Sequence, residues 1–181
     1  MTLFSQQHIE FQKKVHQECP AYGKASLVFA PMVSELINAN QVKKLLDYGS
    51  GLGEVPQNLE IDHQIDVQLY DPAIEKFSAS PASAEMVICL DVLDTVEQDH
   101  IDSVLNDLQR LTEKMAFFSI NTKAAETGSD EQSLSRDNDR HYYPVEWWLP
   151  KLMERFELHY FSRINSGFVV VLRAFTKPSV Q

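Results

Sequence analysis

The chain of 181 residues has little of several features that mark special classes of protein. Its only two cysteines, Cys19 and Cys89, fit no metal or redox spacing, which favours a reducing, cytoplasmic compartment. The longest apolar runs, residues 86–90 and 168–172, are far too short to cross a membrane. The first residues lack a basic stretch followed by an apolar one, so we expect no signal peptide.

Positive charge is also scarce, since 16 Lys and Arg face 26 Asp and Glu and give a net charge of −10. Such a field repels phosphate backbones and anionic lipids, so we expect neither nucleic acid nor a membrane as a partner. The histidines and cysteines match no zinc spacing, and we expect no metal site. With 44% apolar and 23% charged residues, the composition is that of an ordinary packed domain.

Helical and strand patterns alternate along the chain, which is typical of a parallel sheet with helices on both faces. We therefore predict an α/β fold of three layers. Asn165-Ser166-Gly167 separates the last two strands and has the chemistry of a hairpin turn, which adds an antiparallel strand. Ser26 is the predicted N-cap of the second helix, although Pro31 offers a later start. We predict helices over residues 4–18, 26–38 and 98–112, and a fourth helix that begins at residue 144. The predicted strands span residues 43–48, 65–70, 86–90, 115–120, 156–164 and 168–175.

Four polar or glycine positions fall where predicted parallel strands end: Gly49, Asp71, Asp91 and Asn121. In open α/β sheets, ligands bind in the crevice outside the carboxyl ends of the strands. We therefore expect one cleft to collect these residues.

The strongest motif is Asp47-Tyr48-Gly49-Ser50-Gly51-Leu52-Gly53, directly after the first strand. Glycines let the backbone turn sharply and bring N–H groups against a ligand. The dinucleotide fingerprint G-x-G-x-x-G fails because position 54 is Glu. An acid two residues before the first glycine instead favours a cationic amino-acid group. The alternative is a purely structural strand-to-helix turn.

Asp71 is a second candidate, at the end of the second predicted strand. An acid at that place typically accepts hydrogen bonds from both hydroxyls of a ribose. Because Pro72 follows and Asp-Pro commonly begins a turn, a structural role is the alternative.

With these segments the chain resembles the class I S-adenosylmethionine-dependent methyltransferases. The resemblance rests on residues 45–53, on Tyr70-Asp71-Pro72, and on residues 89–96, which look like the family's strand-four segment. Tyr22-Gly23 and residues 146–150 look more narrowly like a small bacterial and phage branch of that family.

The resemblance implies a Rossmann-like methyltransferase fold and S-adenosyl-L-methionine as the cofactor. Asp47 would then lie near the cofactor's amino group, and Asp71 would hold its ribose. The other residues implied at the cofactor are the three glycines Gly49, Gly51 and Gly53, and the segment after the third strand, Asp91, Val92 and Leu93.

Two departures from the family pattern stand out. Asp94-Thr95 replaces the common Glu-His pair, so any role of that His is absent. Residues 72–85 are too few for a crossover, another strand and a second crossover, so we predict that the usual third strand is missing. Phe77 or Met86 would then form the adenine wall.

Methyl transfer to oxygen or nitrogen also requires loss of a proton from the acceptor. The candidate catalytic residues are His141 and Tyr22; His16 is a further possible base but more typical of a structurally satisfied imidazole. Residues 122–143 form a long polar segment that we interpret as a lid or, alternatively, a solvated loop. An anionic or aromatic acceptor pocket there would use Arg136, Arg140, Tyr142 and Tyr143.

These inferences predict a single domain, 1–181, made of N-terminal helices (1–42), a cofactor-binding core (43–121), a lid (122–143), and a helix with a closing hairpin (144–181). The predicted function is methyl transfer from S-adenosylmethionine to a small-molecule or metabolite-linked acceptor; the oligomeric state is left open. The alternative is a reduced methyltransferase fold that serves as a non-catalytic binding module in a complex. The glycine spacing disfavours a nicotinamide or nucleotide-sugar enzyme.

Overall fold

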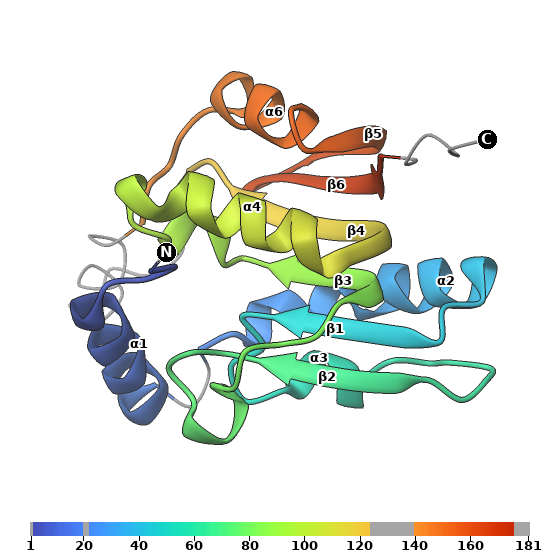
Figure 1. Ribbon diagram of the computed structural model, residues 1–181, viewed down its shortest axis with the longest axis horizontal. Helices are drawn as coiled ribbons and strands as arrows, with labels where there is room; N and C mark the ends of the chain where they lie inside the picture. The colour runs from blue at the N-terminus through green and yellow to red at the C-terminus, as the bar shows by residue number, and fades with distance from the viewer. Residues whose placement is uncertain (1, 20–21, 124–139, 176–181) are drawn as a thin grey trace, which may run out of the picture.

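A computed structural model describes residues 2–19, 22–123 and 140–175 and contains one six-stranded sheet (Figure 1). The strand order is β2-β1-β3-β4-β6-β5. The first four strands run parallel, and β6 is antiparallel to both β4 and β5. This confirms the predicted α/β sheet with its antiparallel C-terminal hairpin. The strands are β1 Lys44–Tyr48, β2 Asp66–Tyr70, β3 Ala84–Leu90, β4 Thr112–Asn121, β5 Phe156–Ile164 and β6 Gly167–Ala174.

Helices cover both faces of the sheet, so the fold has three layers (Figure 1). One face packs against α4 and α6, and the opposite face packs against η1 and α2. The α-helices are α1 Gln6–Glu18, α2 Ala30–Asn40, α3 Glu54–Gln57, α4 Ile101–Leu111 and α6 Val145–Met153. The 3-10 helices are η1 Lys24–Phe29, η2 Glu75–Phe77, η3 Leu93–Thr95 and η4 Gln98–His100.

The predicted absence of the family's third strand is confirmed in the stretch that joins β2 to β3. That stretch is described throughout and contains only η2, so β2 forms one edge of the sheet. The predicted adenine wall is wrong for Met86, which is fully buried in the core on the α2 side. Phe77 is half-buried in η2, and its role at the adenine stays a prediction.

The N-terminal region differs from its prediction in two respects. Residues 24–29 form a 3-10 helix, and the α-helix begins only at Ala30, with Pro31 in its first turn, as the fixed φ of proline favours. Ser26 is therefore not a helix cap; its hydroxyl donates instead to Asp91. Helix α1 lies beside the carboxyl ends of β1 and β2 and is therefore part of the site (Figure 1).

Helix α6 begins after Pro144, as predicted, and carries two adjacent tryptophans. Trp148 is fully buried in the core beneath α6. Trp147 lies on another face of the helix, where its ring stacks on Tyr143 with centroids 4.0 Å apart. Adjacent residues on a helix point to different faces, which explains the division.

Candidate functional site

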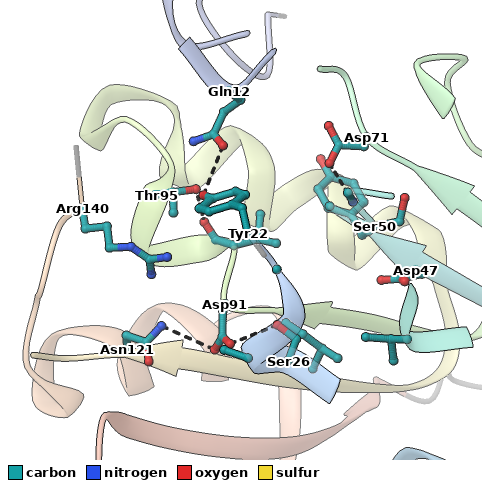
Figure 2. Close-up of a pocket in the computed structure, with 18 of the residues that line it drawn as sticks. Gln12, Tyr22, Ser26, Asp47, Ser50, Asp71, Asp91, Thr95, Asn121 and Arg140 are labelled. Carbon is teal, nitrogen blue, oxygen red and sulfur yellow. Dashed lines mark hydrogen bonds between the residues drawn. The ribbon is translucent and has the colours of Figure 1, made fainter. Parts of the chain in front are cut away.

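A cavity of about 940 Å³ opens at the carboxyl ends of the parallel strands (Figure 2). As expected, it collects Gly49, Asp71, Asp91 and Asn121 from four different strand ends. Helix α1 and the segment before η1 complete its wall. The volume lies in the upper part of the range of small-molecule and cofactor sites.

The glycine segment forms the turn that leaves β1 at the cavity. Gly49 has φ +79°, and a Cβ placed on it would lie 2.3 Å from Cγ2 of Val92. Gly51 has φ +52°, and a Cβ there would meet the imidazole of His16 at 3.1 Å. Both glycines line the cavity, whereas Gly53 does not and is instead required by close packing against Leu69. The turn thus presents backbone to the cavity at positions where few other residues would fit.

Asp47 lies in the central strand β1 and lines the cavity with a carboxyl group that is almost entirely buried. It is 3% exposed, and its Oδ2 atom has no hydrogen-bond partner among the described residues. Burial, together with the negative charge of Asp71, raises the pKa of Asp47 to about 7. A buried carboxylate oxygen without a partner is costly in the free protein, and a ligand cation would compensate it.

Asp71 follows β2, and the residue is only 7% exposed rather than freely solvated at the strand tip. Its Oδ2 accepts a hydrogen bond from the N–H of Gly51 at 2.9 Å, and its Oδ1 accepts one from the N–H of Ala73 at 2.8 Å. Nε2 of His16 lies 3.9 Å from Oδ2. Asp71 therefore joins the glycine turn to the end of β2, as the structural interpretation of this residue predicts. It also lies on the cavity wall, where it can contact a ligand.

Asp91 follows β3 with a left-handed φ of +56°, uncommon for a residue with a side chain. Its Oδ2 accepts a hydrogen bond from the hydroxyl of Ser26 at 3.0 Å, and its Oδ1 accepts one from Ser119 at 2.7 Å. Val92 also lines the cavity. Leu93 was a predicted cofactor residue, but it is fully buried in the core and does not line the cavity.

Tyr22 lines the cavity as one of the two predicted catalytic residues. Its hydroxyl donates to Oε1 of Gln12 at 3.2 Å (Figure 2), and its ring lies edge-on to the ring of His16. Burial raises the pKa of the Tyr22 hydroxyl above its ordinary value. At neutral pH the phenol is therefore protonated, which suits a hydrogen-bond donor better than a base.

His141, the other predicted catalytic residue, does not line the cavity. Its backbone N–H donates to the carbonyl of Asp94, and its ring stacks against Tyr143 with centroids 6.0 Å apart. The neighbours Arg140 and Tyr142 do line the cavity. Most of the predicted lid, residues 124–139 with Arg136, lies outside the described residues.

Arg140 forms an ion pair with Asp94, which is 0% exposed. Burial raises the pKa of Asp94, and the adjoining guanidinium works against that rise. Asn121 lies between this pair and Asp91: its amide nitrogen is 3.3 Å from Oδ2 of Asp94 and 3.4 Å from Oδ1 of Asp91. Asp94 thus holds an arginine at the cavity.

From α1, sequence reasoning named only His16 and missed His8 and Gln12. His8, Gln12 and His16 recur every four residues, lie on one helix face, and all line the cavity. Burial lowers the pKa of His16, and the nearby carboxylate of Asp71 opposes it only in part. The four-residue spacing of polar side chains was the available signal, but it also fits a solvated helix face.

In residues 2–19, 22–123 and 140–175, no group of His, Cys, Asp and Glu has an arrangement suited to a metal ion. Nor does any helix in these segments have the length and apolar character needed to cross a membrane.

No protein-family model and no curated protein matches the sequence, but solved structures match the fold. A 1,6-didemethyltoxoflavin-N1-methyltransferase from Burkholderia thailandensis, with 1,6-didemethyltoxoflavin and S-adenosylhomocysteine bound, has 15% identity and a TM-score of 0.61; the match covers 94% of this chain and 88% of that one. An O-methyltransferase family protein from the same organism has 15% identity and a TM-score of 0.60, over 79% of this chain and 54% of that one.

The 16S rRNA methylase ArmA is also similar, with 16% identity and a TM-score of 0.56 over 92% of this chain and 91% of that one. This chain spans only about half the length of the O-methyltransferase family protein. At these identities the similarity establishes the Rossmann-like fold that the methyltransferases share. It does not extend to an acceptor, because the similar proteins include both small-molecule and RNA methyltransferases.

Proposed function

We propose that this protein is an S-adenosylmethionine-dependent methyltransferase that acts on a small-molecule acceptor. The observation that carries the proposal is the unpartnered, buried carboxylate oxygen of Asp47 on the wall of the strand-end cavity, beside the glycine turn. S-adenosylmethionine carries both an ammonium and a sulfonium cation, and the acids around this end of the cavity suit a cationic ligand.

The residues present fit the cofactor. In the proposal, Asp47 accepts hydrogen bonds from the ammonium group, and Asp71 contacts the ribose hydroxyls. Because Gly49 and Gly51 have no side chain, the cofactor could approach their backbone closely. A Cβ at either position would fill space beside a neighbouring side chain. Bound there, S-adenosylmethionine would supply an activated methyl group for transfer to the acceptor.

The protein's own part in the reaction is to orient the acceptor, exclude water and allow a proton to leave. Helix α1 closes one side of the cavity and would limit access of water. Tyr22, whose O–H donates to Gln12, would orient the acceptor by accepting a hydrogen bond through its phenol oxygen. His141 remains the predicted proton acceptor, a role that requires its ring to turn from Tyr143 toward the cavity.

A small-molecule acceptor is favoured over RNA by charge and by shape. The net charge of −10 opposes approach of a polyanion. The cavity is also recessed among α1 and the strand ends, and one volume of about 940 Å³ has to accommodate both cofactor and acceptor. The part of the cavity that the cofactor would leave free suits a small acceptor.

Calorimetric titration with S-adenosylhomocysteine tests cofactor binding. The wild-type protein should bind, and Gly51→Val should not, because a branched side chain would enter the cavity beside His16. Gly51→Ala carries the same backbone strain with less bulk and should bind with intermediate affinity. Ala82→Val, which adds the same side chain on an exposed link between β2 and β3, is the matched control and should bind as wild type.

Transfer of label from methyl-labelled S-adenosylmethionine then tests the reaction, using separated small-molecule and RNA fractions of a cell extract. Label in the small-molecule fraction supports the proposal, and label only in RNA contradicts its acceptor class. Tight binding without transfer to any fraction would favour a binding module. Equal affinity of wild type and Gly51→Val would refute the cofactor site.

A further inference from the structure

The wall of the cavity is divided by charge. Asp47 and Asp71 lie beside the glycine turn, whereas Arg140 lies on the opposite side of the cavity, near Asn121 (Figure 2). Asp91, which accepts a hydrogen bond from Asn121, is an acid on the Arg140 side, and both of its oxygens also accept from serine hydroxyls. Lys123 also lines the cavity, two residues beyond the end of β4. A cation therefore suits one side, and an anion suits the other.

Arg140 is held in a defined position by its surroundings. Its Nη1 atom donates to the fully buried carboxylate of Asp94, and Asn121 donates to the same carboxylate oxygen. Burial alone lowers the pKa of Arg140, but the carboxylate of Asp94 outweighs this effect and the pKa is raised. The guanidinium is therefore charged at every physiological pH, and its side chain stays 19% exposed at the cavity.

Stability alone is a weak explanation for this ion pair. Buried ion pairs commonly contribute little, because desolvation of both charges offsets their attraction, and apolar side chains can replace them without loss. A guanidinium carries five N–H donors in a flat fork, and the bond to Asp94 uses only part of that fork. The fork matches a planar carboxylate, which it can bind through two parallel hydrogen bonds.

We propose that the methyl acceptor is a small molecule that carries a carboxylate, and that Arg140 binds this carboxylate while Asp94 fixes the guanidinium. This inference rests on the function proposed above and adds the acceptor's chemical class. A carboxylate has one negative charge, which suits a guanidinium already compensated in part by Asp94. A phosphate monoester would bring a second negative charge close to Asp91 and Asp94 and is disfavoured.

The two sides of the cavity would then orient the two ligands relative to each other. Asn121 connects Asp94 to Asp91, so the anchor for the acceptor is linked to the strand end that the methyltransferase resemblance assigns to the sulfonium. Tyr22 and Arg140 both line the cavity, and the positive charge of Arg140 acts against the rise in the pKa of Tyr22. Its ring can contact the body of an acceptor whose carboxylate lies on Arg140.

The test uses the full chain saturated with S-adenosylhomocysteine and three probes of similar shape: benzoate, neutral benzamide, and phenyl phosphate. Dissociation constants are measured by titration followed through protein amide resonances. We expect benzoate to bind at least tenfold more tightly than benzamide or phenyl phosphate. Equal binding of benzoate and benzamide, or tighter binding of phenyl phosphate, would overturn the carboxylate assignment.

Variants locate the probe. Arg140→Lys keeps the charge but loses the fork and should weaken benzoate binding at least tenfold, while the affinity for S-adenosylhomocysteine stays unchanged. Because removal of one partner leaves a buried charge, the double variant Asp94→Asn with Arg140→Gln removes both charges together and should abolish the preference for benzoate. Arg163→Ala, which breaks an exposed pair with Glu146 away from the cavity, is the control and should bind as wild type.

The outcomes separate the two proposals. Unchanged benzoate affinity in both Arg140 variants overturns the anchor, even if S-adenosylhomocysteine binds normally. Failure of the wild-type protein to bind S-adenosylhomocysteine would instead overturn the proposed function itself.

Discussion

The pH dependence of cofactor binding offers a sharp test of the role of Asp47. The carboxyl group has a pKa of about 7 in the free protein, against 3.8 for an unperturbed aspartate. Burial is the main cause and the charge of Asp71 adds to it. Above pH 7 Asp47 is ionised and ready to accept a ligand ammonium; below pH 7 it is protonated, and binding must first release the proton.

The magnitude follows from linkage. Each pH unit below the pKa should raise the dissociation constant of S-adenosylhomocysteine by about tenfold, which corresponds to about 1.4 kcal/mol. Between pH 8 and pH 5.5 the affinity should thus fall by roughly 30-fold. Calorimetry near pH 6.5 in two buffers of different ionisation enthalpy should detect release of about three-quarters of a proton on binding, since that fraction of Asp47 is protonated there.

Asp47→Asn supplies the matched perturbation. The variant should bind more weakly at pH 8, by roughly 10- to 100-fold, because a hydrogen bond to a charged partner contributes about 1.5–3 kcal/mol. It should lose the dependence on pH and release no proton. Asp66→Asn, at the opposite end of β2 and exposed, should keep the wild-type profile. A pH profile that is the same in wild type and Asp47→Asn would refute a contact between Asp47 and the ammonium group.

Two further outcomes are expected. Asp71→Ala should weaken S-adenosylhomocysteine binding by roughly 10- to 100-fold in calorimetry and also lower the melting temperature, since the carboxylate accepts hydrogen bonds from the N–H groups of Gly51 and Ala73; an unchanged melting temperature would contradict the structural part. Gly167→Ala should destabilise the hairpin by about 1–3 kcal/mol in urea unfolding, because its Cβ would lie 2.0 Å from the carbonyl oxygen of Ile120.

The raised pKa of Asp47 also determines how the free energy of unfolding of the ligand-free protein changes with pH. The native state binds the Asp47 proton more tightly than the unfolded chain, so the free energy of unfolding should fall as pH rises from about 4 to 7. Asp47→Asn avoids this loss and should be more stable than wild type at pH 8. The carboxylate would then be an example of a binding group that is unfavourable for stability until its ligand is present.

The sheet and the strand-end residues could be predicted because they follow from local pattern and from a general rule. Runs such as β3 are buried along almost their whole length, as in other central parallel strands. The carboxyl ends of parallel strands meet at one edge, which brings Asp71 and Asp91 to the same cavity although 20 residues separate them in the sequence.

The wrong predictions concern residues whose side-chain direction or hydrogen-bond partner does not follow from the sequence pattern. Met86 belongs to a strand that is buried on both faces, so its apolar character could not tell the core from the ligand side. Leu93 is adjacent to the cavity residue Val92, but the 3-10 helix there turns the Leu93 side chain into the core. Ser26 has the chemistry of a helix cap, but a tertiary hydrogen bond to Asp91 uses its hydroxyl instead.

The pairing of Asp94 with Arg140 shows why the acceptor side was harder to predict than the cofactor side. The candidate cofactor residues sit at strand ends, where the backbone itself defines their positions. Asp94 and Arg140 are 46 residues apart and meet only because the segment before α6 returns to the end of β3. In a sequence, an aspartate or an arginine is most often a solvent-exposed surface residue, so neither Asp94 nor Arg140 stands out. In the structure Asp94 is fully buried and therefore is not such a surface residue. Because Asp94 holds Arg140 at the cavity, Arg140 is the residue on which the chemical class of the acceptor is best tested.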